Sequence, residues 1–514
     1  METPKEIMKI TAIVQARSDS KRLKNKMSTY LSNLKILEWV LIRLKKNDKI
    51  NKFIVATTTK NEKHIIEIAK KYKYSVFKGS ENDVLTRFYL CAKKNKAKII
   101  IRVCADNPFI DSNEINSLIN YFLKNKLDYA YNNMQTKKNL NADGFGAEIF
   151  TFNALEKVNK LAQTKIDREH VTKFIREKKN VFKSACLPAK NGLNFPYLRF
   201  DINTNQDLKK IKKLINDFKI NLNTSAMNIT KFNITKKIDD MLHKLFPMNR
   251  SLTGLDNKKT LDEIKKIIPL NIKKIQSGKK VYDWKVPQEW HVKEGWIKDH
   301  TKNKIVDFKD NNLHLVGYSN KFSGFLTSKE LLKKTHYHPT LPNAIPYKTS
   351  YYNKDWGFCV NKKIYNKIKL SKKKFEIKID SKFKKGNLIY GELLIRGKSK
   401  KEILISTYIC HPSMANDNLS GIILTTYLAK FIKGFKDRYW SYRIIFLPET
   451  IGAISYCKIN EDKMKNIDFG LVICNVGGKG NYGYKKSYNN NHFLNKTVEN
   501  VFNELKIKPK IYPF

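Results

Sequence analysis

The chain has 514 residues, of which 41% are apolar, and it carries 100 Lys and Arg against 47 Asp and Glu. This length exceeds one ordinary core and predicts two or three globular domains, and no apolar run approaches the roughly 20 residues that a membrane-spanning helix needs. Seven scattered cysteines without a CxxC pair argue against a disulfide framework and a cysteine zinc knuckle.

The net charge of +53 raises the question of a polyanionic partner. Most of the basic residues are Lys, however, and they are spread evenly along the chain, whereas nucleic-acid surfaces cluster their charges and favour Arg. We therefore expect a solvated Lys-rich surface and no specific nucleic-acid site. Residues 1–9 contain no apolar signal core, so we expect a cytoplasmic protein without a membrane span.

Short apolar runs alternate with helical patterns from residue 9 to about 215, as in KITAIVQA followed by LKILEWVLIRLKK. This alternation is typical of a parallel sheet covered by helices, so we expect an α/β, Rossmann-like nucleotide-binding domain over 1–215. Residues 216–235 lose this rhythm in favour of Asn, Thr and Lys, and we interpret them as a linker. A second α/β domain is expected over 236–514, with a strand-rich insert at about 281–396.

The loop IVQARSDSKRLKNK leaves the first predicted strand and is basic, with charges at Arg17, Lys21, Arg22, Lys24 and Lys26. It falls at the carboxyl edge of the predicted sheet, where α/β folds bind nucleotides. Its cations are therefore candidates for holding a triphosphate and for stabilising the pyrophosphate that leaves. A solvated loop in a Lys-rich chain is the alternative.

Two further predicted strands end in carboxylates that suit a magnesium ion. Asp106 follows the apolar run IIIRVC, and Asp201 follows a short strand in LRFDINTNQDL. Asp111 is better explained as the cap of a helix that begins near Glu114, and Asp207 as a first-turn residue of the next helix.

In this order, the segments IVQARSDSKRLKNK, KGSENDVLTRF, RVCADNPFID, NADGFGAEIF, REHVT and RFDINTNQDL resemble the cytidylyltransferases of surface-polysaccharide synthesis. That family, which is similar to the enzymes that make CMP-activated acidic sugars and to spore-coat polysaccharide proteins, transfers CMP from CTP to a sugar hydroxyl and releases pyrophosphate. The resemblance implies a nucleotide-diphospho-sugar transferase fold, CTP and a sugar acceptor as partners, and Mg²⁺ as cofactor.

The resemblance also implies roles for individual residues of this chain. The nucleotide-binding residues would be Gln15, Arg17, Arg22, Lys26, Gly79 and Ser80. The magnesium ligands would be Asp106 and Asp201, with Lys26 and Asp106 as catalytic residues, and the acceptor sugar would meet Asp143, Glu148, Arg168, Glu169 and His170. The family's loop usually has Gly and Pro where this chain has Asp19 and Lys24, so a noncatalytic nucleotide-binding domain is the alternative.

In the second half, polar side chains follow predicted strands. KEILISTYIC precedes His411 and Asp417, YRIIFLPE ends in Glu449, and FGLVICNVG is a third strand. If these strands are parallel, the side chains meet on one rim, where an imidazole and a carboxylate can bind zinc and a Glu can accept a proton. The alternatives are a solvated loop histidine, a helix cap at Asp417 and a first-turn role for Glu449.

The segments LFPMNRSLTG, LPNAIPYKTSYY, WGFCV and STYICHPSMANDNLSG resemble the aminopeptidase-like zinc proteins found among polysaccharide genes, over about 236–514. This resemblance implies His411 and Asp417 as zinc ligands and Glu449 as a catalytic residue, while Tyr408 stands where the family has another histidine. A later histidine ligand of the family has no match, and His492 is a weak substitute. We therefore expect an incomplete zinc site and a domain that is incomplete at its carboxyl end.

Two other groups of residues invite simpler explanations. We expect Trp284, Trp290 and Trp296 to fill the core of the strand-rich insert. His336 and His338 would point to opposite faces of an extended segment, so we expect them not to chelate one ion.

The combined hypothesis is a CTP-dependent cytidylyltransferase of surface polysaccharide synthesis fused to a zinc aminopeptidase-like domain. The alternative is a noncatalytic scaffold whose degenerate enzyme domains bind nucleotide or glycan. The expected partners are CTP, a sugar acceptor, and a glycan or peptide ligand, and a homo-oligomer is compatible with the sequence.

Overall fold

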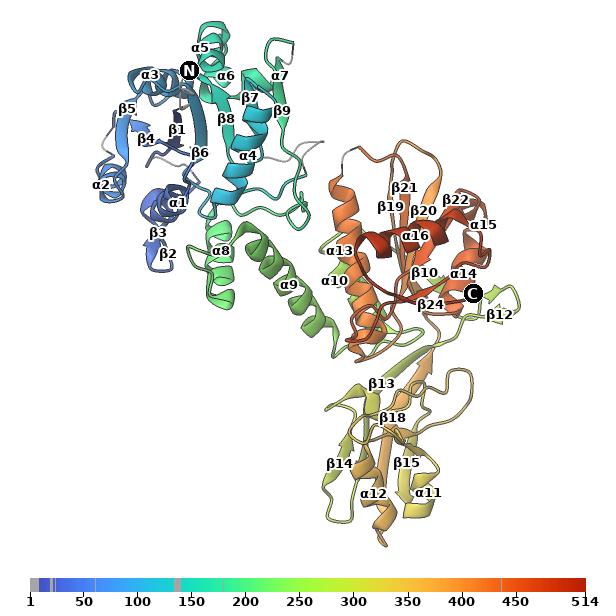
Figure 1. Cartoon of the computed structure of the whole chain (residues 1–514). Helices are drawn as coiled ribbons and strands as arrows, with labels where there is room; N and C mark the ends of the chain where they lie inside the picture. The colour runs from blue at the N-terminus through green and yellow to red at the C-terminus, as the bar shows by residue number, and fades with distance from the viewer. Residues whose placement is uncertain are drawn as a thin grey trace. The chain divides into compact units, whose positions relative to one another are not determined.

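The computed structural model describes residues 9–18, 22–23, 25–60, 62–133, 140–178, 180–435 and 437–514. The chain forms two structural units, residues 1–236 with 434–436 and residues 237–433 with 437–514. The elements of each unit can be followed by their labels in Figure 1. No helix in the described part of the chain is long and apolar enough to cross a membrane.

A seven-stranded sheet forms the centre of the first unit, in the order β5-β4-β1-β6-β8-β7-β9. The strands are β1 (Ile10–Gln15), β4 (Lys52–Thr58), β5 (Ser75–Gly79), β6 (Ile99–Cys104), β7 (Tyr129–Tyr131), β8 (Glu148–Thr151) and β9 (Ser184–Cys186). β5, β4, β1 and β6 are parallel, but β8 runs antiparallel to both β6 and β7. The described residues between β7 and β8 form no crossover helix, and the antiparallel pairing of β8 was not predicted from the sequence.

Helices cover both faces of this sheet because successive strand residues point to opposite sides. Ala12 and Val14 of β1 pack in one core, whereas Ile13 packs in another. The first core includes residues of α1 (Ile36–Lys45), α2 (Lys63–Lys71) and α4 (Ser112–Lys124), and the second includes residues of α3 (Val84–Lys94) and α5 (Phe152–Leu161). Further helices of this unit are α6 (Lys165–Glu169), α7 (Lys173–Glu177) and α8 (Asn205–Phe218). The predicted α/β class is confirmed.

The segment expected to be a linker is helical over much of its length. α9 (Ala226–Leu245) runs across the division between the two units. Ala226, Ile229, Thr230 and Asn233 are all buried at helical spacing. Two of these four are polar, and therefore the apolar period that predicts a helix was hidden in the sequence.

A five-stranded sheet forms the centre of the second unit, in the order β10-β19-β21-β20-β22. The strands are β10 (Asn271–Gln276), β19 (Asn387–Ile395), β20 (Glu402–Tyr408), β21 (Ser441–Leu447) and β22 (Ile467–Val472). β20 is parallel to both β21 and β22, so the carboxyl ends of these three strands lie on one edge of the sheet, as the predicted zinc site requires. α10 (Leu255–Lys265) and α13 (Gly421–Gly434) share one core with this sheet, α14 (Ile451–Ile459) belongs to another, and α16 (Phe493–Glu504) follows near the end.

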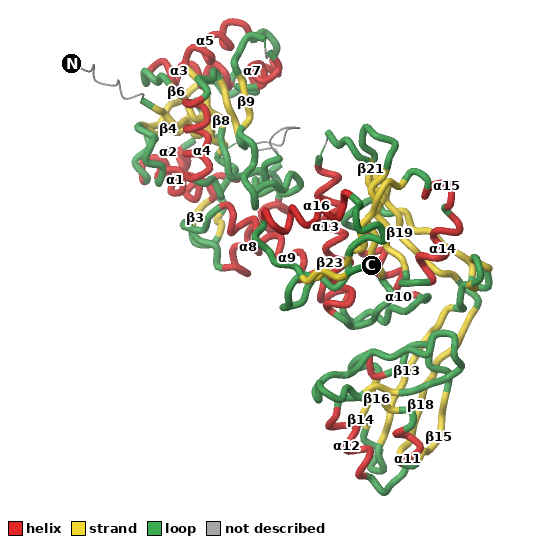
Figure 2. The backbone as a smooth tube through the Cα atoms, turned by 45° about the vertical axis from the view of Figure 1, so that its right-hand side comes forward, coloured by secondary structure: helices red, strands yellow, loops and turns green. Residues whose placement is uncertain are grey.

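The strand-rich insert contains a four-stranded sheet in the order β14-β13-β18-β15. Figure 2 shows its long strands, β13 (Glu289–Lys298) and β18 (Phe375–Lys384), side by side with β14 (Lys304–Asp307), β15 (Phe322–Leu326), α11 (Ser328–Leu332) and α12 (Lys362–Leu370). Trp290 and Trp296 are buried, as expected. Trp284 is 37% exposed, because it lies in the short hairpin strand β12 (Trp284–Lys285) outside this sheet.

Asp111 joins three parts of the first unit and caps α4 as expected. One carboxylate oxygen, Oδ1, accepts hydrogen bonds from the backbone N–H groups of Asn113 (2.9 Å) and Glu114 (3.3 Å), and Oδ2 accepts one from Ala226 (2.8 Å). The buried Arg43 guanidinium lies 3.7 Å from Oδ2.

We predict that Asp111→Ala lowers the free energy of unfolding of the first unit by about 3 kcal/mol, because it removes a cap and leaves Arg43 buried without its carboxylate. Thr151→Ala, which removes only the cap of α5, should cost about 1 kcal/mol. Hydrogen exchange of α1 and α4 in increasing urea measures both. Equal losses would contradict the joining role of Asp111.

Candidate active sites at two sheet edges

Three carboxylates meet beyond the carboxyl end of β6, and we call Asp106, Asp143 and Asp201 together with Lys26 the acidic edge. The backbone holds the three segments side by side. Ile202 N donates to Asp106 O at 2.9 Å, and Phe200 N donates to Asp143 O at 3.0 Å. The two predicted magnesium ligands, Asp106 and Asp201, therefore lie on neighbouring segments, although they are 95 positions apart in the chain.

Two cations separate these carboxylates. The buried Lys26 Nζ lies 3.0 Å from Asp106 Oδ2. Arg199 Nη2 lies 2.7 Å from Asp201 Oδ2 and 3.6 Å from Asp143 Oδ2. Lys26 was predicted, but Arg199 was not, because its partners are revealed only by the folded chain. The acidic edge thus combines hard oxygen ligands with a lysine that can meet phosphate.

Asp143 carries the most perturbed carboxyl group of the acidic edge. Burial and the nearby charges of Asp201 and Asp106 raise its pKa to about 7, although Arg199 opposes the shift. Near neutral pH the group is therefore divided between its acid and its carboxylate. A carboxyl group with this pKa can accept and release a proton at physiological pH.

The predicted nucleotide residues lie along the same end of the sheet. Arg17 and Arg22 are exposed in the loop after β1, whereas Gly79 is the last residue of β5 and Ser80 follows it. A Cβ atom on Gly79 would lie 2.8 Å from Arg87 Cγ, and Arg87 Nη1 donates to Ser80 O at 2.8 Å. Arg87 therefore packs against this turn from α3. Asp19, Lys21 and Lys24 lie outside the described residues.

Glu148, which we expected to face the acceptor sugar, lies in the core instead. Its side chain is 0% exposed and is ion-paired with Arg102 and, at 3.2 Å, with Arg176. Burial raises the pKa of Glu148, but Arg102, Arg176 and the hydroxyls of Thr172 and Tyr129 outweigh burial and hold the pKa below its usual range. A fully buried carboxylate with these partners serves to hold Arg102 rather than to touch a sugar.

Of the expected acceptor residues, Asp143 belongs to the acidic edge, whereas Arg168, Glu169 and His170 lie on α6 and at its end. Arg168 Nε donates to Asp83 Oδ2 at 2.7 Å, and Arg168 Nη1 donates to Ala162 O at 2.9 Å. Arg168 thereby ties α6 to the start of α3. Glu169 and His170 are exposed to solvent.

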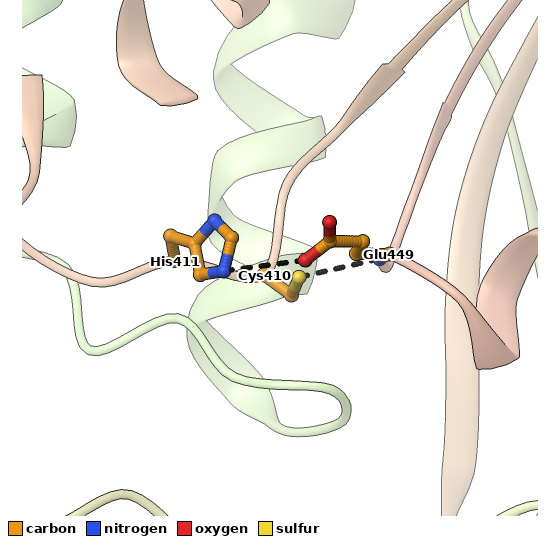
Figure 3. Close-up of side chains that lie close together, drawn as sticks. All are labelled: Cys410, His411 and Glu449. Carbon is orange, nitrogen blue, oxygen red and sulfur yellow. Dashed lines mark hydrogen bonds and ion pairs between the residues drawn. The ribbon is translucent and has the colours of Figure 1, made fainter. Parts of the chain in front are cut away.

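At the second site, a histidine lies between two carboxylates, and we call Tyr408, Cys410, His411, Asp417 and Glu449 the His411 edge. His411 Nδ1 lies 3.2 Å from Asp417 Oδ1, and His411 Nε2 lies 3.4 Å from Glu449 Oε2. Figure 3 shows His411 and Cys410 beside Glu449, whose backbone N–H donates to Cys410 Sγ at 3.2 Å. Ligand atoms of Cys410, His411 and Glu449 all lie within 4.8 Å of one another. The fold therefore brings the three predicted residues, His411, Asp417 and Glu449, together.

Neighbouring side chains orient the His411 edge. Tyr408 Oη donates to Asp417 Oδ1 at 2.7 Å, so this tyrosine orients a predicted ligand. Arg250 Nε donates to His411 O at 2.9 Å. The ring of Tyr347, from the insert, meets the His411 ring edge-on at 5.1 Å between centroids. We predicted none of these contacts, because each joins residues that the sequence alone does not pair.

Asp417 does not act as the helix cap that we considered, because it lies inside the short π-helical turn Ala415–Ser420, whose N-cap is Met414, and its Oδ1 accepts from Tyr408 Oη instead. Burial raises the pKa of Asp417, but the contacts with His411 and Tyr408 outweigh burial and lower it. Burial raises the pKa of the Cys410 thiol to about 12, so that it is neutral at pH 7. His492 caps α16, where its Nδ1 accepts from Leu494 N at 3.3 Å.

The donor set of the His411 edge fits zinc. One imidazole and two carboxylates match the nitrogen and oxygen ligands of catalytic zinc sites. The two carboxylates flank opposite ring nitrogens, and only one ring nitrogen can face a given ion. An ion bound at Nδ1 would therefore lie nearer to Asp417, and an ion bound at Nε2 would lie nearer to Glu449.

A family model for cytidylyltransferases matches residues 11–267. The chain belongs to this family. A second model, for a domain of unknown function (DUF4910), matches residues 239–514, so the chain also belongs to that family.

Individual relatives extend both matches. A Clostridium acetobutylicum protein, described as a candidate polysaccharide biosynthesis protein with an aminopeptidase-like domain, is 44% identical over 265 residues, which are 52% of this chain and 60% of the relative. The spore coat polysaccharide biosynthesis protein SpsF of Bacillus subtilis is 30% identical over 213 residues, 40% of this chain and 85% of its own length. A crystal structure of a candidate peptidase from Clostridium acetobutylicum is 41% identical with a TM-score of 0.53, and the match covers 55% of this chain and 66% of that one.

These matches confirm the two resemblances that the sequence motifs carried. The chain spans less than two thirds of the length of the Clostridium acetobutylicum relatives. Its first half is a member of the cytidylyltransferase family, and its second half resembles an aminopeptidase-like domain.

The pKa of Asp143 predicts how the stability of the metal-free first unit depends on pH. The folded chain holds this proton to about pH 7, whereas the ordinary pKa of a free Asp side chain is 3.8. Between these values the folded state binds more protons, so the free energy of unfolding should fall as pH rises, by about 2 kcal/mol from pH 5 to pH 8. Asp143→Asn should flatten this dependence and the exposed Asp48→Asn should not, as measured by hydrogen exchange in urea. An unchanged slope in Asp143→Asn would refute the assignment.

Proposed function

We propose that this chain transfers CMP from CTP to a sugar hydroxyl and releases pyrophosphate, as a step in surface polysaccharide synthesis. The observation that carries this proposal is the acidic edge, where Lys26 pairs with Asp106 and Arg199 pairs with Asp143 and Asp201, in a chain of the cytidylyltransferase family. Carboxylates that hold a divalent ion beside a cation that holds phosphate are the parts that nucleotidyl transfer requires.

Asp106 and Asp201 would hold Mg²⁺, because hard carboxylate oxygens are the ligands that this ion prefers. The ion, when bound, supplies charge neutralisation for the triphosphate. Lys26 would leave Asp106 for a phosphate oxygen, and Arg17 and Arg22 would bind the phosphates from the loop. These cations stabilise the charge that collects on the departing pyrophosphate.

The chemical step requires a base for the sugar hydroxyl. Asp143 suits this role because its pKa is about 7. The hydroxyl oxygen forms a bond to the α-phosphorus as its proton passes to Asp143, and the bond from the α-phosphorus to the bridging oxygen breaks. Pyrophosphate leaves with the electron pair of that bond. Glu169 and His170, which are exposed, remain proposed contacts of the acceptor sugar.

We predict that Lys26→Ala weakens binding of CTP with Mg²⁺ about tenfold, because one charge-assisted phosphate contact is lost. Asp106→Asn should retain nucleotide but release no pyrophosphate when a sugar acid is supplied. Calorimetry and a pyrophosphate assay measure the two effects, with the exposed Lys160→Ala as the matched control. Unchanged CTP affinity in Lys26→Ala would argue against the acidic edge as the nucleotide site.

The rival function is a noncatalytic scaffold that binds nucleotide or glycan. Both functions predict that the chain binds nucleotide, but only the transferase releases pyrophosphate. Pyrophosphate release by the wild-type chain, lost in Asp106→Asn, would exclude the scaffold, whereas CTP binding without release over a range of acidic sugars would favour it.

We propose a second, metal-dependent activity of the aminopeptidase class for the His411 edge, with a peptide or an amino-substituted glycan as ligand. The supporting observation is the imidazole flanked by two carboxylates. His411 and Asp417 would hold zinc, which when bound polarises a carbonyl group. Glu449 would accept a proton from the attacking water, and its side chain is 47% exposed and therefore open to substrate.

We predict that His411→Ala lowers zinc affinity about a hundredfold or more, and that Tyr408→Phe, which frees Asp417, lowers it about tenfold. The exposed His243→Ala should leave it unchanged. Competition with a chelator, followed by metal analysis, measures all three. Equal zinc affinity in His411→Ala and His243→Ala would place the metal elsewhere.

A further inference from the structure

Gln15, the last residue of β1, has its side-chain amide fixed by a neighbouring strand. Its Oε1 accepts hydrogen bonds from Arg102 Nε at 3.3 Å and from Arg102 Nη2 at 3.0 Å. A guanidinium group can only donate, so the amide oxygen, not the amide nitrogen, must face Arg102. The NH₂ group of Gln15 is therefore turned away from Arg102, and within the described part of the chain it has no hydrogen-bond partner.

Arg102 is itself held firmly by the buried Glu148. Nη1 of Arg102 pairs with Glu148 Oε2, and Glu148 is 0% exposed. Tyr129 Oη donates to Glu148 Oε1 at 2.6 Å, and Arg176 Nη1 donates to the same oxygen at 3.2 Å. A carboxylate with these partners in the core keeps one geometry, because releasing Arg102 would leave charges buried without partners. The orientation of the Gln15 amide is thus set from the core.

Gln15 lies at the edge of the sheet where we propose that the nucleotide binds. It pairs in register with Cys104, two residues before Asp106, and lies at the carboxyl edge where a nucleotide would bind. Its side chain is partly exposed. A donor of fixed direction at such an edge selects ligands that present an acceptor.

We propose that Gln15 distinguishes cytosine from uracil, an inference that rests on the proposed nucleotidyl transfer. The NH₂ group would donate to N3 of cytosine, which is an acceptor, whereas N3 of uracil carries a hydrogen and offers none. Gln15 is the residue that touches the base, and Arg102 and Glu148 are positioning residues that prevent the amide from turning over. This gives Glu148 a role in specificity without contact with either substrate.

The test compares the affinities of the full chain for CTP and UTP with Mg²⁺ by calorimetry. The wild-type chain should prefer CTP by about tenfold or more, since a donor that faces N3–H of uracil is left unpaired. Gln15→Glu keeps an oxygen toward Arg102 but presents a second oxygen to the base. The ratio should therefore fall to about one or reverse, whereas Gln276→Glu, the same change at an exposed residue of the other unit, should leave it unchanged.

A second variant tests the positioning residues. Arg102→Lys keeps a positive charge for Glu148 but cannot reach Gln15 with two donors, so the CTP-to-UTP ratio should shrink several-fold while binding of the triphosphate persists. A ratio that is unchanged in Gln15→Glu, or equal affinities in the wild type, would overturn the inference and leave the nucleotide site in place. A wild-type chain that binds neither nucleotide would instead overturn the proposed function.

Discussion

Parallel strand pairing is the constraint on which both candidate sites depend. In each unit the central strands run the same way, so their carboxyl ends fall on one edge. Asp106 and His411 each follow such a strand end, and each meets side chains from segments far away in the chain. An antiparallel arrangement of β1 and β6, or of β20 and β21, would separate these groups by the length of a strand.

The negative charges of the clustered carboxylates are balanced by different groups at the two edges. At the acidic edge, Lys26 and Arg199 balance three Asp side chains, and burial together with the charges of Asp201 and Asp106 still raises the pKa of Asp143. At the His411 edge, one imidazole separates two carboxylates, and Tyr408 supplies a further donor. In both arrangements, carboxylates remain that could replace water molecules bound to a divalent cation. Ion pairs that serve only stability do not require such groups.

Much of this could be predicted from the sequence. Strand and helix alternation predicted the parallel strands at the centre of both sheets, although β19, which we had placed in the insert, belongs to the second central sheet. Strand ends located Asp106, His411 and Glu449, and turn chemistry identified the Asp111 cap. The antiparallel β8 and the helix α9 could not be predicted, because one pairs antiparallel in an otherwise parallel part of the sheet and the buried face of the other includes the polar Thr230 and Asn233. The buried contact of Glu148 with Arg102 was also beyond sequence motifs, which place a residue in a pattern but not on a face.

The most direct test of the central claim is hydrogen exchange of the full chain with and without CTP and Mg²⁺. The account predicts protection at the end of β1, around Asp106 and around Asp201, because these segments would close on the nucleotide. It predicts no comparable protection around His411, which belongs to the other site. Protection that avoids the acidic edge, or none at saturating CTP, would contradict the account.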